Sequence, residues 1–399
     1  MQPEQLRSQP PVQSQPMNAR FVPPAWLLFE RGGALEVRDL EARAPALALS
    51  GALAAAALEG DAAPLLRLVP FRPELSDFAR DLSAAAPRAL TRADVLRGGG
   101  YRMLFLELGA RCNERCVHCY AESHPSRAEA LTLDEVLAVL DDAHALGFRV
   151  VQLTGGDPLI APTLLPAARR AHALGFETIE IYTNGLSLDR ALLDELLPLR
   201  PSFAFSFYSH DAEIHDAITR TPGSQARTAR AIAMTVDAGL DVRVSLIALE
   251  LNHASLDRTV ELVRALGVSP DAIRVDVQRG VGRGTFAADS DTWTMPAPSG
   301  GSHRPREEIR FGGMACVGFD GLVYPCIFSR HLPLGDLRRE RLRTILERRD
   351  EVVVPAHLEP ASFRERLACG DCQMRAALLT SSGPCVPLRR PSPRPEPTR

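Results

Sequence analysis

The feature that most constrains this 399-residue chain is a group of three cysteines, Cys112, Cys116 and Cys119, within one short loop. Their Cys-x-x-x-Cys-x-x-Cys spacing allows three thiolates to hold three corners of an iron–sulfur cube, a cluster that ordinarily takes four cysteine ligands. Because no fourth cysteine is near, one iron is left open to a ligand from solution. The apolar run at 103–108 predicts a buried strand, so the loop follows a strand's carboxyl end, where α/β barrels place their chemistry.

Two other interpretations of this loop must be weighed. Cysteines often serve as small buried hydrophobic residues, but the neighbouring side chains suit an exposed loop: Arg111, Asn113, Glu114 and Arg115. Zinc sites usually pair their cysteines as Cys-x-x-Cys or use histidine at a set spacing. Since His118 lies between two of the cysteines, zinc remains an alternative.

Composition excludes several classes of function. The net charge of −3 gives no field that would favour nucleic acid, and the chain contains no lysine. The lack of lysine excludes Schiff-base chemistry, pyridoxal phosphate and the lysine of a phosphate-binding P-loop. The amino terminus lacks the apolar segment of a signal peptide, and no apolar run is long enough to cross a membrane. We therefore expect a cytoplasmic protein without a membrane or nucleic-acid partner.

Changes in composition along the chain predict three folded regions between two disordered ends. We expect disorder at 1–20 and 391–399, a small α+β region at 21–97, a core at 98–300 and an extension at 301–390. In the first region, WLLFE and ALEVRDL flank a Gly-Gly turn and predict a β-hairpin. Helices are expected over the whole of ALALSGALAAAALEG, from residue 46, and over PELSDFARDLSAAA, and a hinge is expected at the glycines of 98–100.

The core alternates between predicted strands and helices. Strands are predicted at 103–108, 149–153, 178–182, 202–207, 242–249 and 272–278. Helices are predicted at 132–147, 161–175, 187–198, 224–239 and 254–267. Thr132 with Glu135 follows the capping-box pattern, and Gly147 and Gly175 are typical helix ends. This alternation predicts a parallel sheet with right-handed crossovers, which by itself is compatible with a doubly wound sheet.

The cysteine loop, taken with the motifs that follow the later strands, resembles the radical SAM superfamily from about Met103 to about Cys385. One departure is His118, which stands where the family usually has another aromatic residue. The resemblance implies a partial (βα)6 TIM-like barrel and a [4Fe–4S] cluster at Cys112, Cys116 and Cys119. It also implies that the open iron binds S-adenosylmethionine (SAM), which is cleaved reductively to a 5′-deoxyadenosyl radical that abstracts hydrogen from a substrate.

The same resemblance implies which residues hold SAM. Each of these pieces taken alone is an ordinary turn, and their order after successive strands supports the assignment. Gly282-Arg-Gly284 would pass the adenine, and Arg220 either meets the SAM carboxylate or is a solvated surface arginine. Asp157 replaces the family's glutamate and is one methylene shorter. The implied contacts of SAM are Gly155, Gly156, Asp157, Thr183, Asn184, Gly185, Ser206 and Arg220.

Five further cysteines lie beyond residue 315, and the first two flank a predicted hairpin with its turn at Asp320-Gly321. Two cysteine pairs of this kind are compatible with a zinc ribbon. The region also resembles the SPASM/twitch extension of radical SAM enzymes, which implies one auxiliary [4Fe–4S] cluster. Its ligands would be Cys316, Cys326, Cys369 and Cys372, which leaves Cys385 as a spare, a replacement ligand or a catalytic acid or base.

The extension and the block from His215 to Ser224 resemble peptide-modifying members most, which implies a ribosomally made precursor peptide as substrate. A flavodoxin or ferredoxin would supply the electron. A dehydrogenase or maturase acting on a small molecule or a protein side chain is the alternative, and a non-enzymatic iron–sulfur or zinc protein is a third. Region 21–97 either packs against the barrel or docks a peptide as an added strand on an exposed hairpin edge.

Overall fold

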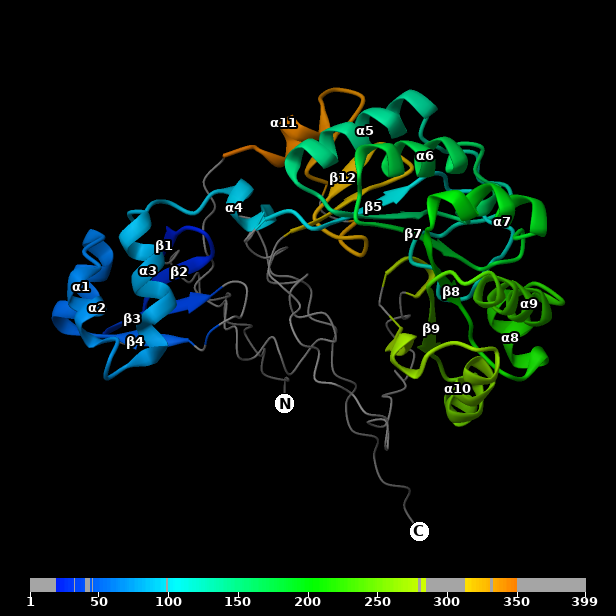
Figure 1. Ribbon diagram of the computed structural model, residues 1–399, viewed down its shortest axis with the longest axis horizontal. Helices are drawn as coiled ribbons and strands as arrows, with labels where there is room; N and C mark the ends of the chain where they lie inside the picture. The colour runs from blue at the N-terminus through cyan, green and yellow to red at the C-terminus, as the bar shows by residue number, and fades with distance from the viewer. Residues whose placement is uncertain are drawn as a thin grey trace, which may run out of the picture. The chain divides into compact units, whose positions relative to one another are not determined.

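The computed structural model describes residues 19–31, 33–39, 44, 46–97, 100–278, 281–284, 313–330 and 333–349. The chain divides into two compact units, of which described residues up to Val95 belong to the first and Leu96 to Arg348 to the second (Figure 1). The dividing point falls within α4 (Arg92–Arg97). The predicted hinge lies mostly outside the described residues, as do the predicted disordered ends, except that Ala19 and Arg20 belong to a strand and not to a disordered end.

The first unit is an antiparallel sheet followed by helices. The strands are β1 (Ala19–Val22), β2 (Trp26–Arg31), β3 (Ala34–Asp39) and β4 (Leu47–Leu49), paired in that order. The helices are α1 (Gly51–Glu59), α2 (Ala63–Leu68) and α3 (Ser76–Ala84), with 3₁₀ turn η1 (Pro73–Leu75). Trp26 packs edge-on against Phe78 at 5.3 Å between ring centroids, and its indole N–H donates to Asp81 at 2.8 Å.

The predicted hairpin is confirmed as β2 and β3, but two expectations for this unit were wrong. The helix expected from residue 46 starts only at Gly51, because Leu47 and Leu49 are buried in β4, which pairs with β3. The hairpin is also not bordered by two free edges, since β1 pairs with β2 and β4 pairs with the middle of β3, at Leu35, Glu36 and Val37. The outer side of β1 itself bridges to Arg88, so among the described residues an added strand would have to pair with β4.

The second unit contains the predicted run of six parallel strands. They are β5 (Met103–Glu107), β6 (Val150–Thr154), β7 (Thr178–Thr183), β8 (Ser202–Ser206), β9 (Val242–Ala248) and β10 (Ile273–Val277), paired in sequence order. Because side chains alternate along a strand, one face of each strand is apolar. Leu104, Leu106, Leu153 and Ile181 are all fully buried on that face.

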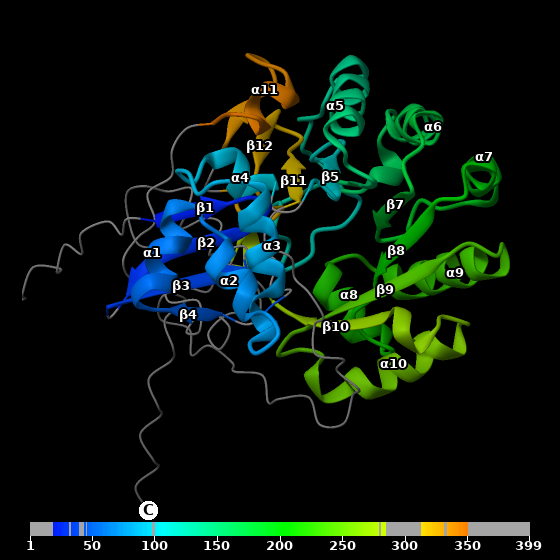
Figure 2. The ribbon, with the colours of Figure 1, turned by 60° about the vertical axis from the view of Figure 1, so that its left-hand side comes forward.

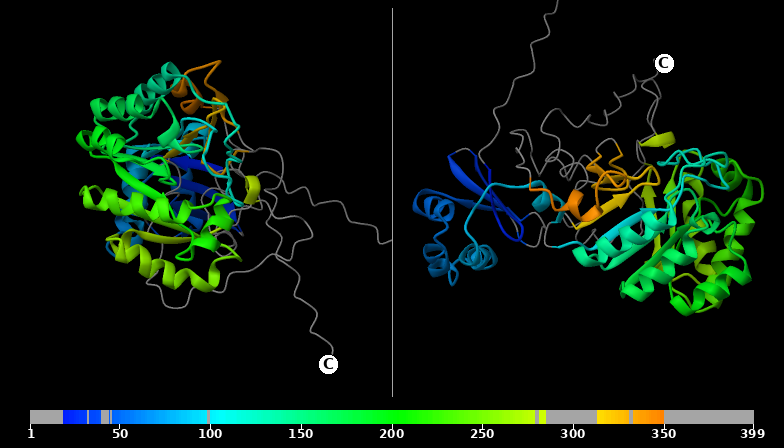
Figure 3. Two further views of the ribbon diagram at one scale, coloured as in Figure 1. Left: turned by 90° about the vertical axis from the view of Figure 1, so that its right-hand side faces the viewer. Right: turned by 90° about the horizontal axis from the view of Figure 1, so that it is seen from above.

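Helices connect these strands and lie along the outside of the sheet (Figures 2 and 3). They are α5 (Leu133–Leu146), α6 (Leu164–Leu174), α7 (Arg190–Leu196), α8 (Ala212–Thr219), α9 (Ser224–Asp237) and α10 (Leu256–Ala265). Both halves of the capping box predicted at Thr132 and Glu135 are present, and Gly147 ends α5 in the left-handed region with φ 99°. Sequence analysis missed α8. The strand order and outer helices confirm the partial barrel.

The hairpin predicted around Asp320-Gly321 is confirmed, and it joins the barrel sheet. Strand β11 (Met314–Val317) pairs in parallel with β5, and Cys316 lies opposite Phe105. Strands β12 (Leu322–Tyr324) and β13 (Gly335–Asp336) continue the sheet, and α11 (Leu342–Leu346) follows. Within the described part of the chain, no helix is both long and apolar enough to cross a bilayer.

Candidate functional site

The three-cysteine loop lies between β5 and α5 and is supported by the end of α8. Arg115 N–H donates to Thr219 O at 3.0 Å, and Val117 N–H donates to Ile218 O at 2.9 Å. Cys112 is buried, and Cys116 and Cys119 are partly buried. The block that begins at His215, which the sequence linked to peptide-modifying enzymes, therefore supports this loop. Contrary to expectation, Glu114 is buried and does not mark an exposed loop.

The donor chemistry of the loop fits an iron–sulfur cluster. Burial raises the pKa of the Cys112 and Cys116 thiols, so without a cation they keep their protons. Cys112 Sγ already accepts from Glu114 N–H at 3.4 Å and from the Asn184 side-chain amide at 3.7 Å. In the described ranges no three His, Cys, Asp or Glu side chains converge on one ion. The thiolates of a cubane bind separate irons, so a cubane does not require such convergence.

His118 serves as an aromatic ring in this loop. It packs edge-on against Tyr208 with 4.8 Å between ring centroids. Burial, with the charge of Arg283 nearby, lowers the pKa of His118 to about 4. The neutral imidazole thus packs as an uncharged ring beside Tyr208.

Gly155 and Gly156 follow β6 and bring this loop against the cysteine loop. A Cβ at Gly156 would stand 1.9 Å from Arg111 O, and a Cβ at Gly155 would stand 2.5 Å from Gly109 O. Gly156 N–H donates to Gly109 O at 2.6 Å. These glycines are therefore required for the close approach of two backbones, a packing requirement that their spacing in the sequence did not reveal.

Asp157 joins the loop after β6 to the loop after β7. One carboxylate oxygen accepts from Leu159 N–H at 2.9 Å. The other accepts from Thr183 Oγ1 at 2.7 Å and from Asn184 N–H at 2.9 Å. Burial raises the pKa of Asp157 to about 6, and these three hydrogen bonds oppose that rise. The sequence did not show what Asp157, with its shorter side chain, would contact. Its carboxylate contacts groups of the protein itself.

Asn184 links the loop after β7 to the cysteine loop. Its side-chain amide donates to Asn113 Oδ1 at 2.6 Å, and Asn113 in turn donates to Ser187 Oγ at 2.9 Å. Gly185 has φ 78°, and a Cβ there would stand 2.9 Å from Ala231 Cβ, so the turn needs glycine. Loops that follow three successive strands are therefore joined around Cys112.

The remaining predicted SAM contacts, Ser206 and Arg220, lie at the carboxyl ends of β8 and α8. Ser206 ends β8 and lies opposite Ser245 of β9. Arg220 is exposed and follows α8 in the left-handed region with φ 53°.

The turn Gly282–Gly284 (η6) after β10 holds the cysteine loop. Arg283 donates from its guanidinium to Cys116 O at 2.9 Å and to Ser123 O at 3.0 Å, and from its backbone to Cys119 O at 3.0 Å. A Cβ at Gly282 would stand 2.3 Å from Tyr120 O. Sequence analysis assigned this turn to the adenine and missed Arg283, because the contact joins residues more than 150 positions apart.

The inner face of the barrel strands, opposite the helices, is polar. Glu180 accepts from Arg243 at 2.8 and 3.1 Å and is also hydrogen-bonded to Gln152. Arg243 lies over the Tyr182 ring at 5.4 Å and donates to Ser245 at 2.8 Å. The interior of a closed TIM barrel is filled mainly with branched apolar residues. A polar inner face is therefore suited to face a ligand.

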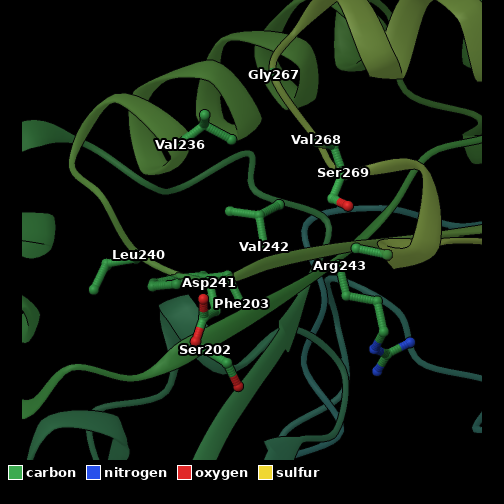
Figure 4. A pocket seen from close by; sticks show the side chains of 11 residues that line it. Ser202, Phe203, Val236, Leu240, Asp241, Val242, Arg243, Gly267, Val268 and Ser269 are labelled. Atoms are coloured by element: carbon green, nitrogen blue, oxygen red, sulfur yellow. The ribbon is translucent and has the colours of Figure 1, made fainter.

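A pocket of about 380 Å³ lies at the other end of the strands, where Ser202 begins β8 and Val242 begins β9 (Figure 4). Arg243 also lines this pocket, and in Figure 4 its side chain leaves the strand on the side opposite Val242. The motifs all follow the carboxyl ends of their strands, so the pocket is not part of the candidate site.

Of the predicted ligands to an auxiliary cluster, the structure places two. Cys316 and Cys326 are both buried, and burial, with Glu107 and Cys326 nearby, raises the pKa of the Cys316 thiol. Cys369, Cys372 and Cys385 lie outside the described residues. Sequence analysis also missed Glu107, a single acid at the end of an apolar strand, which is fully buried beside this hairpin.

Comparisons with known proteins agree with this geometry. Residues 106–278 match the Radical SAM superfamily. AdoMet-dependent heme synthase of Methanosarcina barkeri is 30% identical over 168 residues, which are 42% of this chain and 48% of that protein. The antilisterial bacteriocin subtilosin biosynthesis protein AlbA of Bacillus subtilis is 28% identical over 163 residues, 40% of this chain and 36% of that protein. The chain thus spans less than half the length of each.

The fold is similar to that of Streptococcus suis SuiB bound to precursor peptide SuiA. The TM-score is 0.52 at 10% identity, and the match covers 82% of this chain and 88% of SuiB. At this identity the likeness concerns the fold alone.

Proposed function

We propose that the protein is a radical SAM enzyme that cleaves SAM reductively at a [4Fe–4S] cluster held by Cys112, Cys116 and Cys119, because residues 106–278 match the Radical SAM superfamily. Such a cluster, once reduced by an external donor, would supply the electron for breaking a carbon–sulfur bond of SAM, and the resulting 5′-deoxyadenosyl radical would remove hydrogen from the substrate. The observation that supports the proposal most is the joining of the loops after β5, β6 and β7 around Cys112.

The protein's own residues have distinct parts in this proposal. Asp157 and Asn184 fix the three loops, and Arg283 fixes the cysteine loop from the turn after β10. Ser206 and Arg220 are proposed to contact polar groups of SAM, together with the backbone around Gly155 and Thr183. The polar inner face, with Glu180 and Arg243, would orient the substrate.

For the substrate, we propose a peptide. The likeness in fold to a protein that binds a precursor peptide, and the sequence likeness to a bacteriocin biosynthesis protein, support this class. A small-molecule substrate is the second candidate, and the similarity to a heme synthase favours it. Incubation with SAM, reductant and the short peptides encoded beside this gene tests the choice. A change in peptide mass that depends on SAM would support the proposal. Unchanged peptides, with turnover of a small molecule, would contradict it.

We further propose one auxiliary cluster at Cys316, Cys326, Cys369 and Cys372, and an external donor such as a flavodoxin or ferredoxin. Since each cubane has four irons, the Cys112/Cys116/Cys119→Ala variant should keep about half of the iron after anaerobic reconstitution. Iron analysis and electron paramagnetic resonance measure this directly. Zinc at the second site, or no residual iron, would contradict the auxiliary cluster, and full iron in this variant would contradict the first.

A further inference from the structure

Glu107 is a charged residue at the end of an otherwise apolar strand, and its carboxylate joins three segments of the second unit. It is fully buried at the carboxyl end of β5. It accepts from Tyr120 Oη at 3.2 Å, from Phe319 N–H at 3.4 Å, and from both terminal nitrogens of Arg330 at 2.9 and 3.1 Å. Tyr120 directly follows Cys119, whereas Phe319 and Arg330 belong to the segment that carries Cys316 and Cys326.

The partner of Glu107 is held by aromatic rings. The Arg330 guanidinium lies 4.8 Å from the centroid of Phe319 and 5.5 Å from that of Tyr324. Only 17% of its side chain is exposed. Because water is largely excluded, a charge that lost its partner here would be costly, so the pair strongly favours one position of the hairpin.

A second ion pair also connects this segment to the barrel but differs in exposure. Arg341 donates to Asp142 of α5 at 2.7 and 3.0 Å, and 63% of the Arg341 side chain is exposed. Exposed pairs of this kind contribute little. It therefore serves as a matched control for the buried pair.

We propose that Glu107 is a positioning residue: through Arg330 and Tyr120 it sets the place of the Cys316–Cys326 hairpin relative to the loop of Cys112, Cys116 and Cys119. The docking of the hairpin stands on the contacts above. Its consequence for two clusters rests on the proposed function. One buried carboxylate would thus fix the distance between the two proposed cluster sites.

The proposal is tested by thiol alkylation of the reduced, iron-free, full-length protein, with the rate at each cysteine read by mass spectrometry. In Glu107→Gln we expect both Cys316 and Cys326 to react about tenfold faster or more, relative to Cys112, because the buried donors Tyr120, Phe319 and Arg330 have lost their charged acceptor. Acceleration of Cys316 alone would count against the proposal, because the charge of Glu107 itself raises the pKa of that thiol. In Arg341→Gln their relative rates should stay within about twofold of the wild type. A loss of stability throughout the protein would instead raise the rates at all described cysteines together.

A double variant distinguishes the loss of the Glu107–Arg330 ion pair from a general loss of stability. Glu107→Gln/Arg330→Met removes both charges, so no buried ion is left without a partner, and Cys316 should return toward the wild-type rate. Equal acceleration of Cys112 and Cys316 in Glu107→Gln, or faster alkylation of Cys316 in the double variant than in Glu107→Gln, would overturn the proposal.

Reconstitution with iron and sulfide gives a second readout. We expect Glu107→Gln to hold about half the wild-type iron, since one four-iron site has lost its docked hairpin. Wild-type iron content with unchanged electron paramagnetic resonance signals in Glu107→Gln would contradict the consequence for the clusters. If the wild type bound no iron, the proposed function would fail, whereas the alkylation rates would still decide the role of Glu107.

Discussion

At the scale of single residues, the site depends on side chains that join neighbouring loops. Asp157 is the clearest case, since its carboxylate accepts from two backbone N–H groups and one hydroxyl. Asp157→Ala leaves these donors buried without an acceptor, so we expect the free energy of unfolding to fall by about 2–3 kcal/mol. Denaturant unfolding of the iron-free protein measures it. Asp189→Ala removes an exposed helix cap with one such bond and should cost about 1 kcal/mol. Equal losses of unfolding free energy in the two variants would contradict the role of Asp157 in joining the loops.

A substitution of Arg220 should weaken SAM binding without lowering the stability of the protein. It is exposed in the left-handed conformation that glycine adopts more easily. Arg220→Gly should therefore leave the free energy of unfolding unchanged or raise it by up to about 1 kcal/mol. If Arg220 pairs with the SAM carboxylate, the KM for SAM should rise about tenfold or more. An unchanged KM would identify Arg220 as a surface arginine and exclude it from the SAM site.

At the scale of elements, the turn after β10 and the loop after β5 act together, although they are distant in sequence. Arg283→Gln removes charged hydrogen bonds to Cys116 O and Ser123 O. We expect the reconstituted protein to lose iron to a chelator several-fold faster, because the cysteine loop is held less firmly. Arg264→Gln, at an exposed arginine of α10, is the control and should not differ from the wild type. Equal rates in all three proteins would rule out this role for Arg283.

Sequence patterns predicted most elements of the barrel because they depend on local spacing. The apolar run ending at Leu108 and the caps at Thr132 and Gly147 each act within a few residues. The contacts that sequence analysis missed join distant segments, as in Glu107 with Arg330 and Arg283 with Cys116. Strand β4 was missed because Leu47 and Leu49 precede an alanine-rich helix, and only pairing with β3 distinguishes them from its first turn.

At the scale of the whole molecule, the two units should have separable functions. The first unit has its own sheet and its own core around Trp26 and Phe78. A truncated protein beginning at Gly98 should still cleave SAM without substrate. If a peptide docks on the first unit, by adding a strand beside β4, the truncated protein should bind that peptide more weakly in isothermal titration. Equal affinities of the full-length and truncated proteins would exclude docking there.

The central claim is that Cys112, Cys116 and Cys119 hold the cluster at which SAM is cleaved. The most direct measurement is the amount of 5′-deoxyadenosine formed after anaerobic reconstitution with dithionite and SAM. We predict that the wild type forms this product and that the Cys112/Cys116/Cys119→Ala variant forms none. A Cys316/Cys326→Ala variant should retain the activity, because its changes lie outside the first site. Wild-type amounts of 5′-deoxyadenosine from the Cys112/Cys116/Cys119→Ala variant would contradict the claim.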